Sequence, residues 1–217
     1  MPRTWRLLCL LVATAALGAC GIGQQTRHEV QSSNLSLGAT DLETGGVGFL
    51  TPAAATGREA DKQALAQAFA RALGDARPGV KIVPLPSILS DVNAADLDQD
   101  YKSMYRDYLE TGILEGSVLK RVGEVGGVRY LVQLSLADFQ QLSRSRLSFF
   151  GLRLMDTKQA NLRVFLQVWD SHTGAVAWEG GGELNYAYDS ATENPAPLVT
   201  VASRAAERLL RELPGSR

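Results

Sequence analysis

The stretch Asn161–Tyr188, NLRVFLQVWDSHTGAVAWEGGGELNYAY, decides the fold because it reads as two long strands joined by a tight turn. Apolar residues alternate with polar ones from Leu162 to Val168, the period of a strand with one buried face. Asp170–Gly174 predicts the turn, since an aspartate side chain binds the amides that follow it and glycine tolerates positive φ. Gly180–Gly182 indicates a bulge in the second strand, or a place where another element crosses close to it.

Immediately upstream, Val128–Phe139 alternates in the same way and predicts a third long strand. Between it and Asn161 lies a basic and apolar stretch, Gln140–Lys158, whose alternation favours extension of the flanking strands into a long arm. Such an arm is suited to binding a partner, a membrane or a sister subunit; the alternative is a loop packed back on its own domain. The candidate binding residues of the arm are Arg144, Arg146, Phe149, Phe150 and Arg153.

Earlier parts of the chain alternate between short strands and helices. Strands are expected at 46–50 and 80–83. Helices are expected at 57–74 and from 93 to Thr111, followed by a third helix that ends at Val125 and a last helix after Pro197. Thr56 and Glu59 read as a capping box for the first helix, and Asn93 as the N-cap of the second. The order β-α-β-α-α-β-β-β-α predicts an α/β (α+β) fold of two layers, with a mixed, mostly antiparallel five-stranded sheet and helices against one face.

The first twenty residues read as a targeting signal. Arg3 and Arg6 precede an apolar run of eleven residues, Leu7–Leu17, which is too short to span a bilayer and matches a signal-peptide core. The run ends in Leu17-Gly18-Ala19-Cys20, which resembles a bacterial lipobox. That resemblance implies cleavage before Cys20 and lipidation of this cysteine. It also implies retention in the outer membrane, facing the periplasm, because Gly21 replaces the aspartate that holds enteric lipoproteins in the inner membrane; the inner membrane remains the alternative.

Gly21–Gly45 has the composition of a linker, rich in Gln, Ser, Thr, Asn and Gly. A flexible coil of this length spans roughly 25–30 Å. The sequence therefore predicts four segments: a signal peptide at 1–19, the lipidated cysteine and a flexible tether at 20–45, a single α/β domain at 46–213 with an arm at 140–158, and a tail at 214–217.

Composition excludes several classes of function. The formal net charge of the 217-residue chain is -1, so nothing predicts a nucleic-acid partner, which requires a basic surplus. Both cysteines, Cys9 and Cys20, lie in the first twenty residues, and the only histidines are His28 and His172. The body of the chain therefore offers no thiol nucleophile and no set of histidine ligands, and we expect no cofactor and no metal.

Three short motifs are better explained by structure than by chemistry. Ser117 and Lys120 match the Ser-x-x-Lys of penicillin-recognising enzymes, but the other motifs of that family are absent. Asp96, Asp98 and Asp100 have the spacing of a calcium loop, but Tyr101 stands where the loop needs glycine. Glu179 and Glu183 could be read as paired carboxylates, but they lie on the polar face of a predicted strand, the usual place for glutamate.

The order of elements, the strand Gly127–Val132 and the hairpin Trp169–Trp178 resemble the domain of curli-secretion-channel lipoproteins. They are similar also to the N-terminal domain of TolB and to lipoproteins that activate penicillin-binding proteins. The resemblance implies a non-enzymatic role in envelope assembly, secretion or regulation, and in the curli channel long hairpins build the pore. Here the basic residues of the arm disfavour a strand pair that faces lipid.

From the sequence we expect a membrane-anchored periplasmic lipoprotein that is not an enzyme and that binds another envelope protein. Two alternatives remain: a homo-oligomer that forms a ring or secretion channel, and a hydrolase acting on envelope polymers.

Overall fold

The computed structural model describes residues 25–149, 152–190 and 196–215, and the side chains of residues 27–142, 158–187 and 196–215 among them. The described elements are, in chain order, β1 (Gln25–Asn34), α2 (Asp41–Gly45), β2 (Val47–Phe49), β3 (Ala53–Ala54), α3 (Glu59–Ala76), β4 (Ile82–Val83), α4 (Leu85–Ala94), α5 (Asp98–Thr111), α6 (Gly116–Gly126), β5 (Tyr130–Phe149), β6 (Leu152–Asp170), β7 (Ala175–Ser190), α7 (Leu198–Leu209) and the 3₁₀ turn η1 (Leu210–Glu212).

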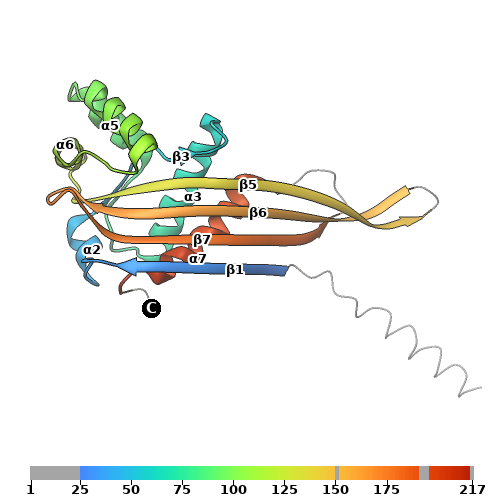
Figure 1. Ribbon diagram of the computed structural model, residues 1–217. Helices are drawn as coiled ribbons and strands as arrows, with labels where there is room; N and C mark the ends of the chain where they lie inside the picture. Colours follow the sequence, from blue (N-terminus) through green and yellow to red (C-terminus); the bar gives the residue numbers. More distant parts are fainter. Residues whose placement is uncertain (1–24, 150–151, 191–195, 216–217) are drawn as a thin grey trace, which may run out of the picture.

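In the described part of the chain, seven strands form one sheet in the order β1-β7-β6-β5-β2-β4, with β3 paired to β5 (Figure 1). Strands β1, β7, β6 and β5 pair antiparallel, whereas β2 pairs parallel with both β5 and β4. The α/β class and the mixed, mostly antiparallel sheet are confirmed. The predicted number of five strands is wrong, because β1 and the two-residue β3 were not expected.

The three longest strands carry the arm. Gln25 of β1 lies opposite Ala187 of β7, which lies opposite Gln159 of β6, itself opposite Leu142 of β5. Beyond this row β5 and β6 continue as a paired hairpin through Ser143–Phe149, roughly 23 Å at about 3.3 Å per residue. The arm and the start of β1 therefore point toward the same end of the sheet (Figure 1).

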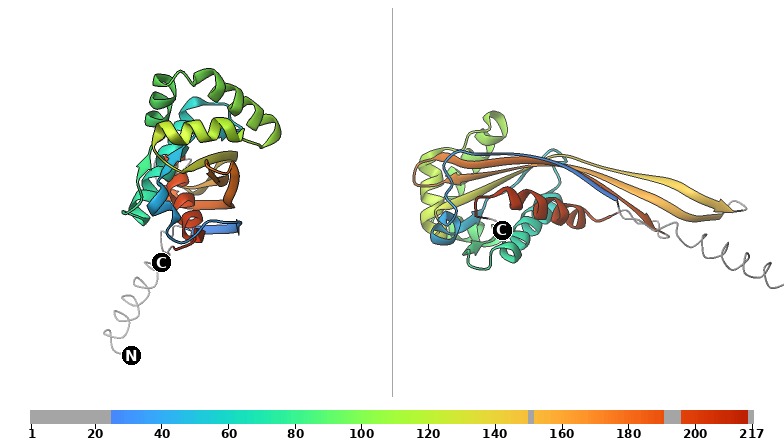
Figure 2. Two further views of the ribbon diagram at one scale, coloured as in Figure 1. Left: turned by 90° about the vertical axis from the view of Figure 1, so that its left-hand side faces the viewer. Right: turned by 90° about the horizontal axis from the view of Figure 1, so that it is seen from below.

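One face of the sheet is covered by α3 and α7, except along the arm, which extends beyond both helices (Figure 2, right). The even-numbered residues from Ala160 to Val168 of β6 and from Trp178 to Tyr186 of β7 point into this larger core, where they meet the apolar faces of the two helices. Trp178 is its bulkiest side chain and is 1% exposed. Burial in this core explains the alternation of apolar and polar residues along the strands of Asn161–Tyr188, because every second side chain is buried there.

A second, smaller core lies on the opposite face, at the end of the sheet farthest from the arm. There α4, α5 and α6 pack against Leu131 of β5 and Trp169 of β6 (Figure 2, left). Helices were expected against one face of the sheet only; this expectation is wrong, because α4, α5 and α6 pack against the opposite face. Within the described residues, no helix combines the length and the apolar composition needed to cross a bilayer.

The expectation of a flexible tether is wrong from Gln25 onward. Residues 25–34 form β1, which pairs with β7 along its whole length, and residues 41–45 form α2. The sequence did not indicate this strand because β1 is an edge strand whose described side chains are mostly exposed, so it lacks the apolar alternation of a buried strand. Only Val30 packs against the larger core.

Two helix starts also differ from prediction. Helix α3 begins at Glu59 with Arg58 as its N-cap and no side-chain cap, so the capping box of Thr56 and Glu59 does not form. Asn93 does not start a helix but lies in the last turn of α4. Helix α4 was not expected; its N-cap is Pro84 and its first turn contains Pro86, two positions where a helix tolerates proline.

Gly180–Gly182 keeps a regular register with both neighbouring strands, so the predicted bulge is wrong. Two aromatic rings explain the triplet instead. A Cβ on Gly180 would lie 2.4 Å from the buried ring of Trp178, and a Cβ on Gly181 would lie 2.8 Å from the ring of Phe165 on the opposite face. The glycines let both rings lie close to the backbone from the two sides of the sheet.

Candidate functional site

The most distinctive surface of the molecule is the side of β1, β7 and β6 opposite α3 and α7, which we call the open face. No described helix covers it beyond the end occupied by α4–α6 (Figures 1 and 2). Because side chains alternate along a strand, the odd-numbered residues of these three strands point onto it. From β1 outward they are Arg27, Glu29, Gln31 and Ser33; Glu179, Gly181, Glu183 and Asn185; and Asn161, Arg163, Phe165 and Gln167.

The open face is hollowed where the sheet meets α5. The hollow has a volume of about 790 Å³. Its floor includes Phe165, Gln167 and Glu179, and Tyr108 of α5 contributes to its wall. A hollow of this size, lined by polar groups around the Phe165 ring, suits a protein segment or another ligand of similar dimensions.

Phe165 is the apolar centre of this surface. It lies directly opposite Gly181, and its ring packs over the glycine backbone. Its other side remains in contact with water, so that the side chain is 48% exposed. A large apolar side chain at a polar-face position, held in place by a glycine, has the character of an anchor residue in protein recognition.

Charged residues surround the ring. Arg163 Nη2 and Asn161 Nδ2 both donate to the carboxylate of Glu183, each at 3.2 Å. These bonds hold the pKa of Glu183 below its ordinary value, with the Asn161 amide as the largest cause. Glu29 of β1 lies opposite Glu183 of β7, and Glu29 makes no ion pair with any described residue. The open face is therefore polar and slightly acidic near Phe165.

The boundary between the open face and α5 is hydrogen-bonded. Gln167 Oε1 accepts from the Tyr108 hydroxyl at 3.4 Å and from Trp169 Nε1 at 3.3 Å. Burial raises the pKa of Tyr108, so this hydroxyl keeps its proton. The neighbouring Gln133 is buried, and its Oε1 has no hydrogen-bond partner among the described residues. The wall of the hollow is thus a donor and acceptor network rather than a nucleophile with a base.

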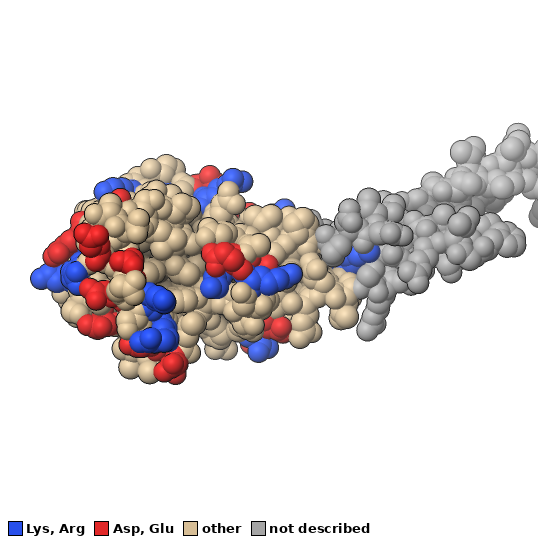
Figure 3. Space-filling model, turned by 90° about the horizontal axis from the view of Figure 1, so that it is seen from above, with Lys and Arg blue, Asp and Glu red and all other residues tan. Residues whose placement is uncertain are grey.

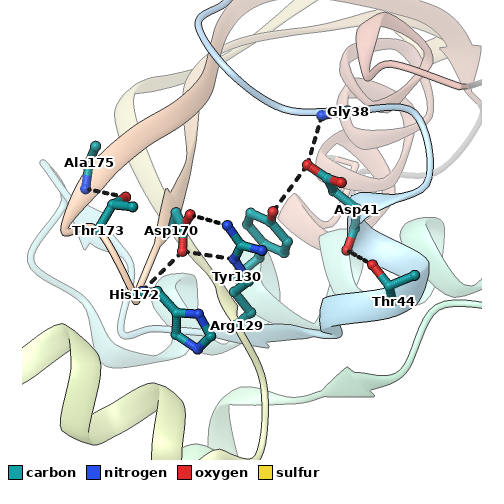
Figure 4. Close-up of polar contacts among 9 residues, drawn as sticks. All are labelled: Gly38, Asp41, Thr44, Arg129, Tyr130, Asp170, His172, Thr173 and Ala175. Carbon is teal, nitrogen blue, oxygen red and sulfur yellow. Dashed lines mark hydrogen bonds and ion pairs between the residues drawn. The ribbon is translucent and has the colours of Figure 1, made fainter.

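A second polar cluster lies at the end of the sheet away from the arm (Figure 4). Arg129 binds Asp170 through two hydrogen bonds, of 3.1 and 2.7 Å, and Asp170 also accepts from the His172 amide at 3.0 Å. The Arg129 guanidinium lowers the pKa of Asp170, and the same bond raises the pKa of Arg129. These contacts close the β6–β7 turn, as the sequence predicted for Asp170–Gly174.

The same cluster ties the N-terminal part of the chain to the sheet. The Tyr130 hydroxyl donates to Asp41 at 3.1 Å, and Asp41 also accepts from the Gly38 amide at 2.9 Å (Figure 4). Burial raises the pKa of Tyr130 to about 12. Each of these polar groups is engaged in holding α2, β5 and the turn together, so the cluster is structural.

The sequence-predicted site residues are only partly placed. Cys20 and Phe150 lie outside the described residues. The backbones of Arg144, Arg146, Phe149 and Arg153 lie on the arm, while their side chains lie outside the described part. The structure therefore gives the position of the arm, beside the open face, but no contact made by the side chains of its five candidate binding residues.

Two of the dismissed motifs have residues at exposed positions of helices, where these residues make polar contacts. The Ser117 hydroxyl bonds Glu115, and Asp100 pairs with Arg121. No group of three or more histidine, cysteine, aspartate or glutamate residues among the described positions could hold a metal ion. Figure 3 shows acidic and basic side chains intermixed over the helical end of the molecule.

The chain matches no known protein-family model, and no curated protein matches its sequence. Solved structures do match. The PelC dodecamer from Paraburkholderia phytofirmans is 13% identical, with a TM-score of 0.47, over 88% of this chain and 100% of that one. A single-site variant of the same PelC gives 14% identity and a TM-score of 0.44, over 88% of this chain and 98% of that one. Lipoprotein GNA1162 from Neisseria meningitidis is 11% identical, with a TM-score of 0.37, over 76% of this chain and 96% of that one.

The similarity is distant. It concerns the arrangement of helices and strands alone, since identities this low leave the surface residues free to differ.

Proposed function

We propose that this protein is a non-enzymatic bacterial lipoprotein that binds another envelope protein through the open face and the adjoining arm. The observation that carries the proposal is the half-exposed Phe165 on Gly181, at the centre of a hollowed sheet surface that the described helices leave uncovered. An aromatic anchor surrounded by polar groups is the usual arrangement of a protein-recognition surface.

Binding is supported over catalysis by the state of the polar groups around the ring. Two carboxylates could serve as an acid and a base, but Glu183 is engaged with Asn161 and Arg163, which stabilise its ionised form. General acid catalysis needs a carboxyl group whose pKa is raised, whereas the pKa of Glu183 is lowered. The hydrolase alternative therefore has no support from this face.

Anchoring through Cys20 is part of the proposal and rests on the lipobox. Cys20 precedes the first residue of β1, Gln25, by five positions. A fully extended segment of that length reaches at most about 18 Å. A lipidated Cys20 would therefore hold the sheet close to its membrane, with the arm at the same end as the anchor. We propose the periplasmic face of the outer membrane as the location.

The binding proposal is tested by copurification from cells after mild crosslinking. Phe165→Ala should lose the crosslinked partner, whereas Leu109→Ala, which removes a side chain that is 55% exposed on α5, should retain it. A second variant replaces residues 144–157 by an Asn-Gly turn joining Ser143 to Lys158, which lie opposite each other. Unchanged capture by both the Phe165 and the arm variants, with the fold intact by circular dichroism, would remove the open face from the account.

Anchoring is tested separately. Cys20→Ala should leave the precursor uncleaved at this site and release the protein from detergent-dependent membrane fractions. A variant that still carries lipid, or that is still processed to the same mature mass, would show that the anchor lies elsewhere.

A further inference from the structure

The two edges of the sheet are protected very differently. At one edge β4 has two residues, Ile82–Val83, and is flanked by Lys81 and Pro84, which discourage pairing with another strand. At the other edge β1 has ten residues and, among the described strands, pairs on one side only, with β7. It contains no proline and no lysine, and its register with β7 has no bulge. Long, regular and unprotected edges of this kind are templates for a further strand.

The hydrogen-bond pattern shows which groups of β1 are available. Leu35 N donates to the Ala177 carbonyl at 3.0 Å, next to the paired residues Asn34 and Trp178. Backbone groups alternate between inward and outward along an antiparallel strand. The odd-numbered residues of β1 therefore bond β7, and the even-numbered residues, including His28 and Val30, present their N–H and C=O groups to the outside.

The charges of β1 select a partner. Arg27 and Glu29 point onto the open face, and neither forms an ion pair with any described residue. Glu29 is in addition opposite a like charge, Glu183. An antiparallel strand whose sequence is that of β1 itself satisfies both: with His28 opposite its own copy, Arg27 of each strand lies opposite Glu29 of the other. This is a position without mutual hydrogen bonds, where facing side chains approach most closely.

We propose that β1 pairs with β1 of a second copy of this chain, antiparallel and centred on His28, so that two sheets join into one. The two-fold axis is perpendicular to the sheet, and both open faces lie on the same side of the joined sheet. The two arms point in opposite directions. This self-association goes beyond the proposed binding function and does not depend on it.

The charge pattern is tested with the full chain extracted in detergent, by measuring its mass as a function of concentration. The native protein should show a dimer. Arg27→Glu, and separately Glu29→Arg, should each raise the dissociation constant at least about tenfold, because each creates two facing pairs of like charge. The double variant R27E/E29R exchanges the two charges and should restore the dimer. A native monomer at every concentration, or a double variant as weak as the single ones, would overturn the proposal.

The register is tested by oxidation in the same detergent extract. His28→Cys places two thiols opposite each other across the axis, at the separation of a directly paired position, and should form a disulfide-linked dimer. Ser32→Cys places them roughly 26 Å apart, at about 3.3 Å per residue, and should not. The two variants do not differ from each other at Cys9 or Cys20, so these cysteines do not explain a difference. Equal crosslinking of the two variants, or none in either, would refute the register.

Discussion

Three consecutive glycines should respond very differently to the same substitution. Gly180→Ala places a Cβ 2.4 Å from Cη2 of Trp178 and 3.0 Å from Leu209 Cδ1, inside the larger core. Trp178 is 1% exposed and cannot move into free space. Overpacking of a close-packed core costs typically about 1–3 kcal/mol. Replacement of glycine by alanine in a compatible backbone returns about 0.4–1 kcal/mol through the unfolded chain.

The expected net loss for Gly180→Ala is therefore about 1–2 kcal/mol. In a domain of this size each kcal/mol lowers Tm by about 2–4 °C, so a decrease of roughly 2–8 °C is expected. The matched control is Gly182→Ala, whose Cβ would have no atom nearer than 3.8 Å, the Glu29 carbonyl oxygen. It should be neutral or slightly stabilising. Gly181→Ala should fall between them, because the ring that it meets, Phe165, is half-exposed and can turn away.

Urea unfolding followed by tryptophan fluorescence measures the order directly, because Trp169 and Trp178 are both buried. Gly182→Ala should be the most stable of the three variants and Gly180→Ala the least stable. Equal destabilisation by the Gly180 and Gly182 substitutions would refute this order, because it would show that a general property of the strand, rather than the Trp178 ring, requires glycine there.

Two further substitutions probe the ends of the sheet. Asp170→Asn should lower the free energy of unfolding near neutral pH by roughly 1 kcal/mol; the loss is small because Arg129 is partly exposed and solvent screens the ion pair. Arg129 lowers the pKa of Asp170, so this stabilisation is present above the unfolded pKa of about 3.9 and is lost as the pH falls below it. The stabilities of the native protein and the variant should therefore converge in acid unfolding curves. Tyr101→Phe removes the acceptor of the Thr51 N–H, at 2.8 Å, and should cost about 1–3 kcal/mol by urea unfolding, because Tyr101 is buried. Tyr105→Phe removes a hydroxyl that donates to the Pro52 carbonyl, and it should cost less because Tyr105 is only half-buried.

Residues that alternate strictly could be read from the sequence. The strands around Leu162–Val168 and the turn Asp170–Gly174 follow from period and turn chemistry, and so does the end of α6 at Gly127, which adopts positive φ. β1 could not be read in this way, because an edge strand buries too few side chains to leave a period. Its pairing depends on β7, which is distant in sequence.

The open face could be predicted only in part. Phe165 stands at a polar-face position between Arg163 and Gln167, and that irregularity was a usable signal. Its partner could not be inferred, because a shift of one residue in the register of β6 and β7 would place Gly181 on the other face. Which end of the sheet the helices cover is likewise a property of packing, and it decides that this ring is exposed.

Binding of another envelope protein by the open face can be measured by photo-crosslinking in intact cells. An unnatural amino acid is placed at position 165 and, as a control, at position 109 on α5. We expect a discrete adduct from position 165 that contains a second envelope protein, and no such adduct from position 109. Adducts from position 165 that contain only this chain, or no adduct at all, would contradict such binding.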